Sequence, residues 1–231
     1  EDGNEMSNAI AHNVVICPWP REGPMRGCTV PGTDNAEADT SLNQAGLWAL
    51  PAPNHYVGNR FANSFNGLFI QSNFDGGNGR GFAEGLVCSE YQAFGRVRFN
   101  TNHGHARFGT YFLGPSFPRH LEQSVATNGR TNLSTCAGFA GDGTDAGWPF
   151  RISQNVDYGN VFVGQYDTGD LQYQDHVSVD NLNLMYWKTT KNFADGCSSH
   201  LSGGTFANGN LALPDQSAFV IERTHFDGTI P

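Results

Sequence analysis

Short segments in which apolar and polar residues alternate recur along the chain, and each is followed by a turn rich in Gly and Asn. Two clear examples are residues 56–70 and residues 219–228. In the C-terminal third, the apolar residues Leu184, Phe206 and Phe226 are separated by 22 and 20 residues. A spacing near twenty residues, with short strands and no helical periodicity, is typical of a solenoid coiled from β-strands.

The same pattern predicts where the strands and the insertions lie. Before residue 114 we expect strands over residues 11–16, 47–50, 56–70, 94–99 and 106–113, and after residue 150 we expect short strands at closer spacing. Long loop insertions are expected at residues 17–46, 71–90 and 114–150. About 20–25 residues per turn of the coil then gives roughly seven or eight rungs in one domain, residues 1–231. We also expect this domain to be a piece of a longer chain or part of a larger assembly.

The composition agrees with strands joined by tight turns. Gly is abundant, with 29 residues, whereas Lys occurs only twice, which disfavours a helical protein. The formal net charge of −9 disfavours nucleic acid as the main partner. No stretch approaches 18 consecutive apolar residues, so no membrane-spanning segment is expected.

The numerous Asn residues are expected to be structural. Asn side chains stacked at equivalent turns can bond to one another and to the backbone along a coil, as amide ladders do in stacked strands. Most Phe side chains are expected to stack inside the coil.

Five cysteines show no CxxC pair and no spacing typical of a metal site. Cys17 and Cys28 flank a segment rich in Pro and Gly, so a disulfide between them is predicted, with isolated buried thiols as the alternative. The pairing of Cys88, Cys136 and Cys197 stays open. The sequon at Asn132 agrees with a secreted or cell-surface glycoprotein.

One family pattern is carried by a set of residues in the first third of the chain. The set is Asp2, Gly3, Glu5, Asn8, Asn13, a loop with Pro and Cys, Trp48, Asn54, Asn59, Ala62, Ser64, Gly67 and Phe69. Their order resembles the parallel β-helix region of G8-domain proteins, which include cell-surface hyaluronidases, hyaluronan-binding proteins and fibrocystin-like proteins. The resemblance covers residues 1–70 and, with generic repeats, residues 150–231. It implies a right-handed parallel β-helix in an extracellular setting that acts on or holds hyaluronan. No catalytic residue carries over, because those proposed for the hyaluronidases belong to a region before the matched segment.

A basic stripe is the first candidate for ligand binding. Strand alternation places Arg96 and Arg98 on one face, and His103, His105 and Arg107 share a face if that segment is extended. These residues could hold a carboxylate or sulfate, since Arg offers a two-pronged donor to such groups. The alternatives are an outward face paired with neighbouring carboxylates, or a metal held by the His pair.

An acidic cluster is the candidate for catalysis. Asp167, Asp170, Asp175 and His176 would serve glycoside hydrolysis or a lyase reaction if two of them stood at a suitable separation. Asp residues in turns, however, are common for hydrogen-bonding reasons alone. Asp142 and Asp145 resemble a fragment of a calcium loop, but they lack its spaced ligands, so no cofactor is expected apart from this possible calcium.

Together these features predict an extracellular structural or carbohydrate-binding module whose partners are an anionic polysaccharide or neighbouring domains. The alternatives are a polysaccharide hydrolase or lyase of hyaluronidase-like type, and a scaffold subunit of a larger assembly.

Overall fold

The protein is described here from a computed structural model. The structure describes residues 7–17, 45–49, 54–71, 95–113, 119–120, 146–147, 150–168, 171–188, 199–213 and 219–230. All regular elements among these residues are β-strands, and no helix within them is long and apolar enough to cross a membrane. The expected Cys17–Cys28 disulfide, the sequon at Asn132 and the calcium candidates Asp142 and Asp145 depend on residues outside these ranges and stay predictions.

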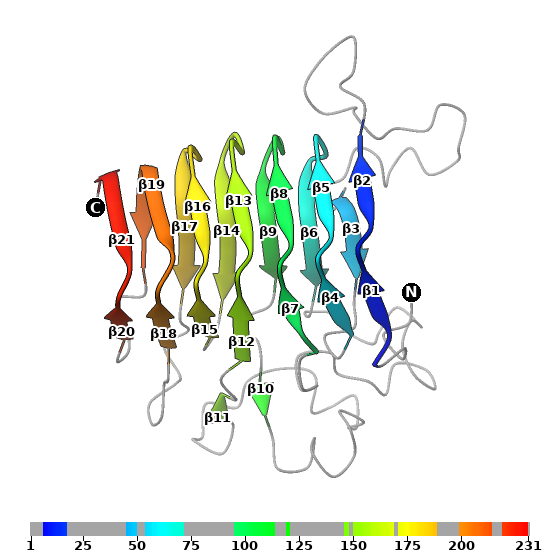
Figure 1. Ribbon diagram of the computed structural model, residues 1–231, viewed down its shortest axis with the longest axis horizontal. Coiled ribbons are helices and arrows are strands. Elements are labelled where there is room, and N and C mark those ends of the chain that lie inside the picture. Colours follow the sequence, from blue (N-terminus) through cyan, green and yellow to red (C-terminus); the bar gives the residue numbers. More distant parts are fainter. Residues whose placement is uncertain are drawn as a thin grey trace.

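The chain coils through three faces, and the strands of each face lie side by side along the coil (Figure 1). The first face is a seven-stranded sheet of β1 (Ala9–Ala11), β4 (His55–Val57), β7 (Val97–Arg98), β12 (Phe150–Ser153), β15 (Leu171–Gln174), β18 (Ser199–Ser202) and β20 (Phe219–Glu222). The second face contains β2 (Val14–Ile16), β5 (Arg60–Ala62), β8 (Thr101–His103), β13 (Val156–Tyr158), β16 (Val177–Val179), the first part of β19 (Thr205–Ala212) and β21 (His225–Ile230).

The third face contains β3 (Ala45–Ala49), β6 (Asn66–Gln71), β9 (Phe108–Leu113), β14 (Val163–Thr168), β17 (Asn183–Lys188) and the second part of β19. Every pairing within the three faces is parallel, and β19 joins the second and third faces into one twelve-stranded sheet. The short antiparallel pair of β10 (Arg119–His120) and β11 (Ala146–Gly147) is separate from the coil. The prediction of an all-β chain with parallel strands is therefore confirmed.

Alternation along each strand sends one set of side chains into a narrow interior. On the first face the residues at matching positions are Tyr56, Val97, Ile152, Tyr173 and Leu201, and all are buried. On the second face Phe206 pairs in register with Phe226, and their rings lie 5.8 Å apart. Phe206 is fully buried, as predicted for the Phe residues, whereas Phe226 is exposed.

One anchor of the predicted repeat was wrong. Leu184 lies in β17 on the third face, whereas the residue in register with Phe206 on the preceding rung is Ser178. The sequence pattern favoured Leu184 because it is apolar and near the expected spacing. On that rung the second face contributes the buried Ser178, while Leu184 is buried in the core from the third face.

A ladder of Asn side chains runs along the corner between the first and second faces. The Oδ1 atom of each member accepts a hydrogen bond from the backbone N–H of the preceding one, from Asn13 to Asn59 (3.1 Å), Asn59 to Asn100 (3.0 Å) and Asn100 to Asn155 (2.8 Å). Asn59 and Asn100 also donate their amide N–H groups to the backbone carbonyls of Ile10 and Tyr56. This ladder confirms the predicted role of stacked Asn side chains.

A second ladder follows the corner between the second and third faces, and its members are Ser64, His105, Asn160 and Asn181. The backbone N–H of Ser64 donates to Nδ1 of His105 at 3.2 Å, and that of His105 donates to Oδ1 of Asn160 at 3.0 Å. Asn160 in turn donates to Oδ1 of Asn181 through its backbone N–H (2.8 Å) and its side chain (2.9 Å).

Glycines leave room for polar side chains beside this second ladder. A Cβ atom at Gly109 would lie 2.3 Å from Oδ1 of Asp157 and 2.6 Å from the carbonyl oxygen of Gly164. One at Gly67 would lie 2.5 Å from Oδ1 of Asn102. Distances this short exclude a side chain, so these positions require Gly because of the close approach of neighbouring rungs.

Candidate functional site

The outer side of the first face presents two columns of side chains. The strand register aligns His55, Arg96, Arg151, Gln172 and His200 in the first column. The second column aligns Arg98, Ser153, Gln174, Ser202 and Glu222. Neighbouring rungs of a parallel sheet lie about 4.8 Å apart, so the polar residues of each column follow one another at this spacing. The columns turn apolar toward their ends, at Ala9 and Val220 in the first column and at Val57 in the second.

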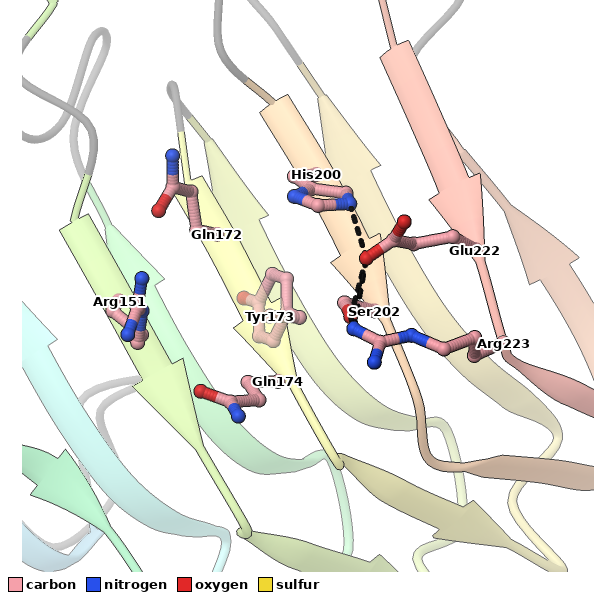
Figure 2. Close-up of a pocket in the computed structure, with 8 residues that line it drawn as sticks. All are labelled: Arg151, Gln172, Tyr173, Gln174, His200, Ser202, Glu222 and Arg223. Carbon is pink, nitrogen blue, oxygen red and sulfur yellow. Dashed lines mark hydrogen bonds and ion pairs between the residues drawn. The ribbon is translucent and has the colours of Figure 1, made fainter.

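Two adjoining pockets follow these columns. The first, of about 320 Å³, is lined by Gly95, Arg96, Val97, Arg98, Phe150, Arg151 and Ser153. The second, of about 230 Å³, is lined by Arg151, Gln172, Tyr173, Gln174, His200, Ser202, Glu222 and Arg223 (Figure 2). Because Arg151 lines both, we treat the two pockets as one first-face groove.

The Arg98 side chain is the most enclosed of the three arginines in the first pocket. Its Cζ atom lies 5.3 Å from the ring centre of Phe99, and its Nε atom is buried without a hydrogen-bond partner in the described part of the chain. A buried donor without a partner is costly, which indicates that this pocket is suited to an added acceptor.

The carboxylate of Glu222 organises the second pocket. Its Oε1 atom accepts hydrogen bonds from Oγ of Ser202 at 3.0 Å and from the Arg223 guanidinium at 2.9 Å. Nε2 of His200 lies 3.5 Å from the same oxygen. The hydrogen bond from Ser202 and the charge of Arg223 lower the pKa of Glu222, so this exposed carboxyl is ionised at neutral pH.

The predicted basic stripe is divided among three faces. Arg96 and Arg98 lie in the first-face groove, but His103 is on the second face, where its ring stacks on Tyr158 with centres 4.7 Å apart. Arg107, at the third face, lies over the ring of Phe108 at 4.3 Å. The expectation that His103 and Arg107 share a face was wrong, because the chain turns a corner between them.

His105 faces inward and is a member of the second ladder. Its side chain is fully buried, and burial lowers the pKa of the imidazole to about 3. A neutral, inward-facing ring cannot join His103 in holding an external anion or metal. No group of three or more His, Cys, Asp or Glu residues that could hold a metal ion occurs among the described residues.

The acidic candidates are also separated. Asp167 and His176 are fully buried inside the coil, Asp175 is exposed at a turn with φ of 52°, and Asp170 lies outside the described residues. A polysaccharide on the surface cannot reach Asp167 or His176. The prediction that these residues form one catalytic cluster therefore fails for the three that the structure describes.

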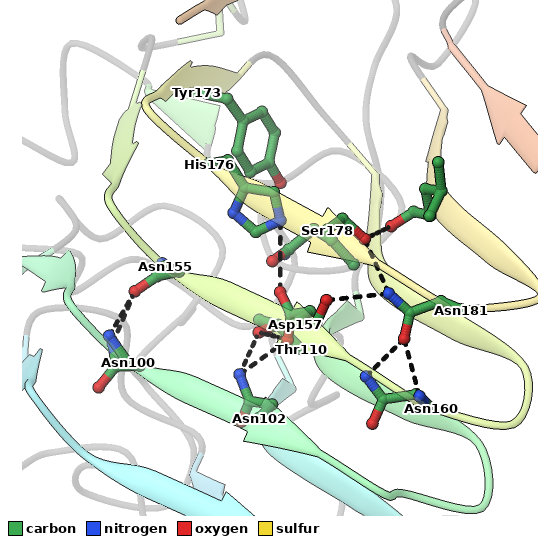
Figure 3. A network of polar contacts seen from close by, with 12 residues as sticks. Asn100, Asn102, Thr110, Asn155, Asp157, Asn160, Tyr173, His176, Ser178 and Asn181 are labelled. Atoms are coloured by element: carbon green, nitrogen blue, oxygen red, sulfur yellow. Dashed lines mark hydrogen bonds and ion pairs between the residues drawn. The ribbon is translucent and has the colours of Figure 1, made fainter. Parts of the chain in front are cut away.

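The buried members belong to an interior polar network (Figure 3). Oδ1 of Asp157 accepts hydrogen bonds from Asn102 at 2.9 Å and Thr110 at 3.2 Å, and Nε2 of His176 lies 3.3 Å from Oδ2 of Asp157. Burial raises the pKa of Asp157 and lowers the pKa of His176 to about 3, so the proton of this pair resides on Asp157.

Asp167 extends this network toward the first face. Its carboxyl accepts hydrogen bonds from Gln165 at 2.7 Å and from the hydroxyl of Tyr173. Burial raises the pKa of Asp167 well above its usual range. Burial thus disfavours the charged forms of these acids, which lie inside the coil and do not face a ligand.

Most groove residues were missed by the sequence analysis. The signal was their fixed distance from the first ladder: His55, Arg96 and Arg151 each stand four residues before Asn59, Asn100 and Asn155 in turn. Aligning the chain on the ladder would have placed Arg151 beside Arg96.

Comparison of the chain with models of known families, with curated proteins and with solved structures gave no match.

Proposed function

We propose that the first-face groove binds an anionic polysaccharide and that the protein is an extracellular module of the G8-domain type, with a right-handed coil. The observation that carries the proposal is the concentration of arginine. The chain has eleven Arg residues and a net charge of −9, and four of these arginines line this one groove: Arg96, Arg98, Arg151 and Arg223. Guanidinium groups pair with carboxylate and sulfate through two parallel hydrogen bonds.

The spacing of the groove supports a polymer as the ligand. Rungs about 4.8 Å apart advance by a distance comparable with the length that one sugar adds to an extended polysaccharide. Gln172, Gln174 and Ser202 continue the groove with amide and hydroxyl groups, which suit the hydroxyls of a sugar. Several weak contacts along the groove can together give useful affinity for a polymer.

The small number of carboxyl groups in the groove favours binding over hydrolysis. Glycoside hydrolysis usually requires two carboxyl groups on either side of the scissile bond. In the part of the chain that the structure describes, Glu222 is the one carboxylate that lines the two pockets. We therefore place hydrolase and lyase activity behind binding.

The test is retention on immobilised hyaluronan and polygalacturonate. Replacing both Arg96 and Arg151 by Ala should lower affinity about tenfold, because two charge-assisted contacts are lost. Arg60→Ala is the matched control, since Arg60 is an exposed arginine on the second face. Equal retention of the double variant and the wild type would refute the proposal, provided that both show the same circular dichroism.

A further inference from the structure

The two halves of the first-face groove differ in charge. We call the pocket with Arg96, Arg98 and Arg151 the arginine half, and the pocket around Glu222 the glutamate half. Among the described residues, those that line the arginine half include no carboxylate. Those that line the glutamate half include one, Glu222, which pairs with the arginine beside it.

The arginine half is built to receive an acidic group. Arg96 immediately precedes β7 and lies beside Arg151 of the adjacent strand β12, because Val97 and Ile152 are in register, and Arg98 stands in the second column. Nε of Arg98 is buried and has no hydrogen-bond partner among the described residues. Three positive groups on neighbouring rungs, one of them with an unused donor, match a single carboxylate or sulfate.

The glutamate half is arranged differently. The Ser202 hydroxyl, the Arg223 guanidinium and the His200 imidazole all lie at Oε1 of Glu222. Oε2 has no such contact among these three groups and can accept a hydrogen bond from a sugar hydroxyl. Figure 2 shows the Gln172 and Gln174 side chains between Arg151 and this carboxylate, so neutral amides fill the middle of the groove.

We infer that the groove prefers one order of charge along its polysaccharide, with an acidic sugar on the arginine half and uncharged sugars along the glutamate half, and that Glu222 weakens the binding of a second acidic sugar. This inference rests on the proposed function and adds the order of charge along the ligand. The physical basis is like-charge repulsion, which gives specificity by penalising the wrong ligand rather than by improving the right one. Glu222 is therefore a residue that determines specificity.

The experiment compares two oligogalacturonates of equal length by isothermal titration calorimetry. One has every carboxyl free, and the other has a single free carboxyl with the remaining carboxyls methyl-esterified. Glu222→Gln keeps the shape of the side chain and removes its charge. It should raise the ratio of the affinity for the fully acidic oligomer to the affinity for the single-acid oligomer about fivefold.

Asp227→Asn is the matched control, because Asp227 is an exposed acid on the second face and its replacement changes the net charge equally. If Asp227→Asn produced the same shift, or if Glu222→Gln left the ratio of the two affinities unchanged, the inference would be overturned while binding itself stood. If wild-type protein bound neither oligomer nor hyaluronan, the proposed function would fail and the inference with it.

Discussion

Replacing Asn100 by Ala removes the central member of the Asn ladder. Its Oδ1 atom accepts hydrogen bonds from the backbone N–H and the side-chain amide of Asn59, both at 3.0 Å. Its Nδ2 atom donates to the carbonyl of Tyr56 at 2.8 Å and to Oδ1 of Asn155 at 3.2 Å. The side chain is fully buried, so water cannot replace these partners without entering the corner of the coil.

The cost follows from which groups lose their partners. The backbone N–H of Asn59 is left buried without this acceptor, whereas the side-chain amide of Asn59 keeps the carbonyl of Ile10 and Oδ1 of Asn155 keeps the backbone N–H of Asn100. A buried donor without a partner costs about 1–3 kcal/mol, and each other lost bond about 1 kcal/mol. We expect Asn100→Ala to lower the free energy of unfolding by about 3 kcal/mol.

Urea unfolding followed by far-ultraviolet circular dichroism measures this loss. Asn183→Ala is the control, because the Asn183 side chain makes one exposed hydrogen bond, to the carbonyl of Phe162 at 3.2 Å, and should cost less than about 1 kcal/mol. Equal losses for the two variants would show that the ladder does not stabilise the coil as argued.

Two further predictions concern the interior. Burial raises the pKa of Asp167, so the folded state holds the Asp167 proton more tightly than the unfolded state. This contribution to stability is present below about pH 4 and is lost as pH rises toward the folded pKa. Asp167→Asn should therefore flatten the fall in stability between about pH 4.5 and 7, and an unchanged dependence of the urea-unfolding free energy on pH across that range would contradict this prediction. Gly109→Ala would place a Cβ atom 2.3 Å from Oδ1 of Asp157 and should lower stability by about 2–3 kcal/mol. Gly159→Ala has no atom within 4 Å of the added Cβ and a φ of 62°, so it should cost about 1 kcal/mol through the backbone alone. Thermal unfolding of the two variants measures the difference, and equal melting temperatures would argue against close packing around Gly109.

The fold class could be predicted because strand alternation and turn composition are local properties. The stacking of Asn could also be predicted, since few other roles suit so many buried amides. The members of each ladder were harder to find, because the separations of successive partners are 46, 41 and 55 residues in the first ladder. Because insertions of different lengths separate the rungs, ladder partners do not recur at a fixed spacing in the sequence.

The site was only partly predicted for a related reason. Arg96 and Arg98 stand out as neighbours in sequence, but Arg151 reaches the same pocket through the strand pairing of β7 with β12. His105 occupies a position in the second ladder, and His176 lies in the interior polar network. Both side chains are fully buried. A His among polar residues suggests a surface role, and only the register of the coil shows that these two face inward.

The long segments between strands have a consequence for how this protein could evolve. Long stretches of sequence separate β6 from β7, β9 from β12 and β17 from β18, each where the third face gives way to the first, and another separates β2 from β3, where the second face gives way to the third. Residues can be gained or lost there without altering any ladder, since segments outside regular elements tolerate such changes best. Changes in these segments could thus alter which ligand the protein prefers while the strands and ladders of the coil stay the same.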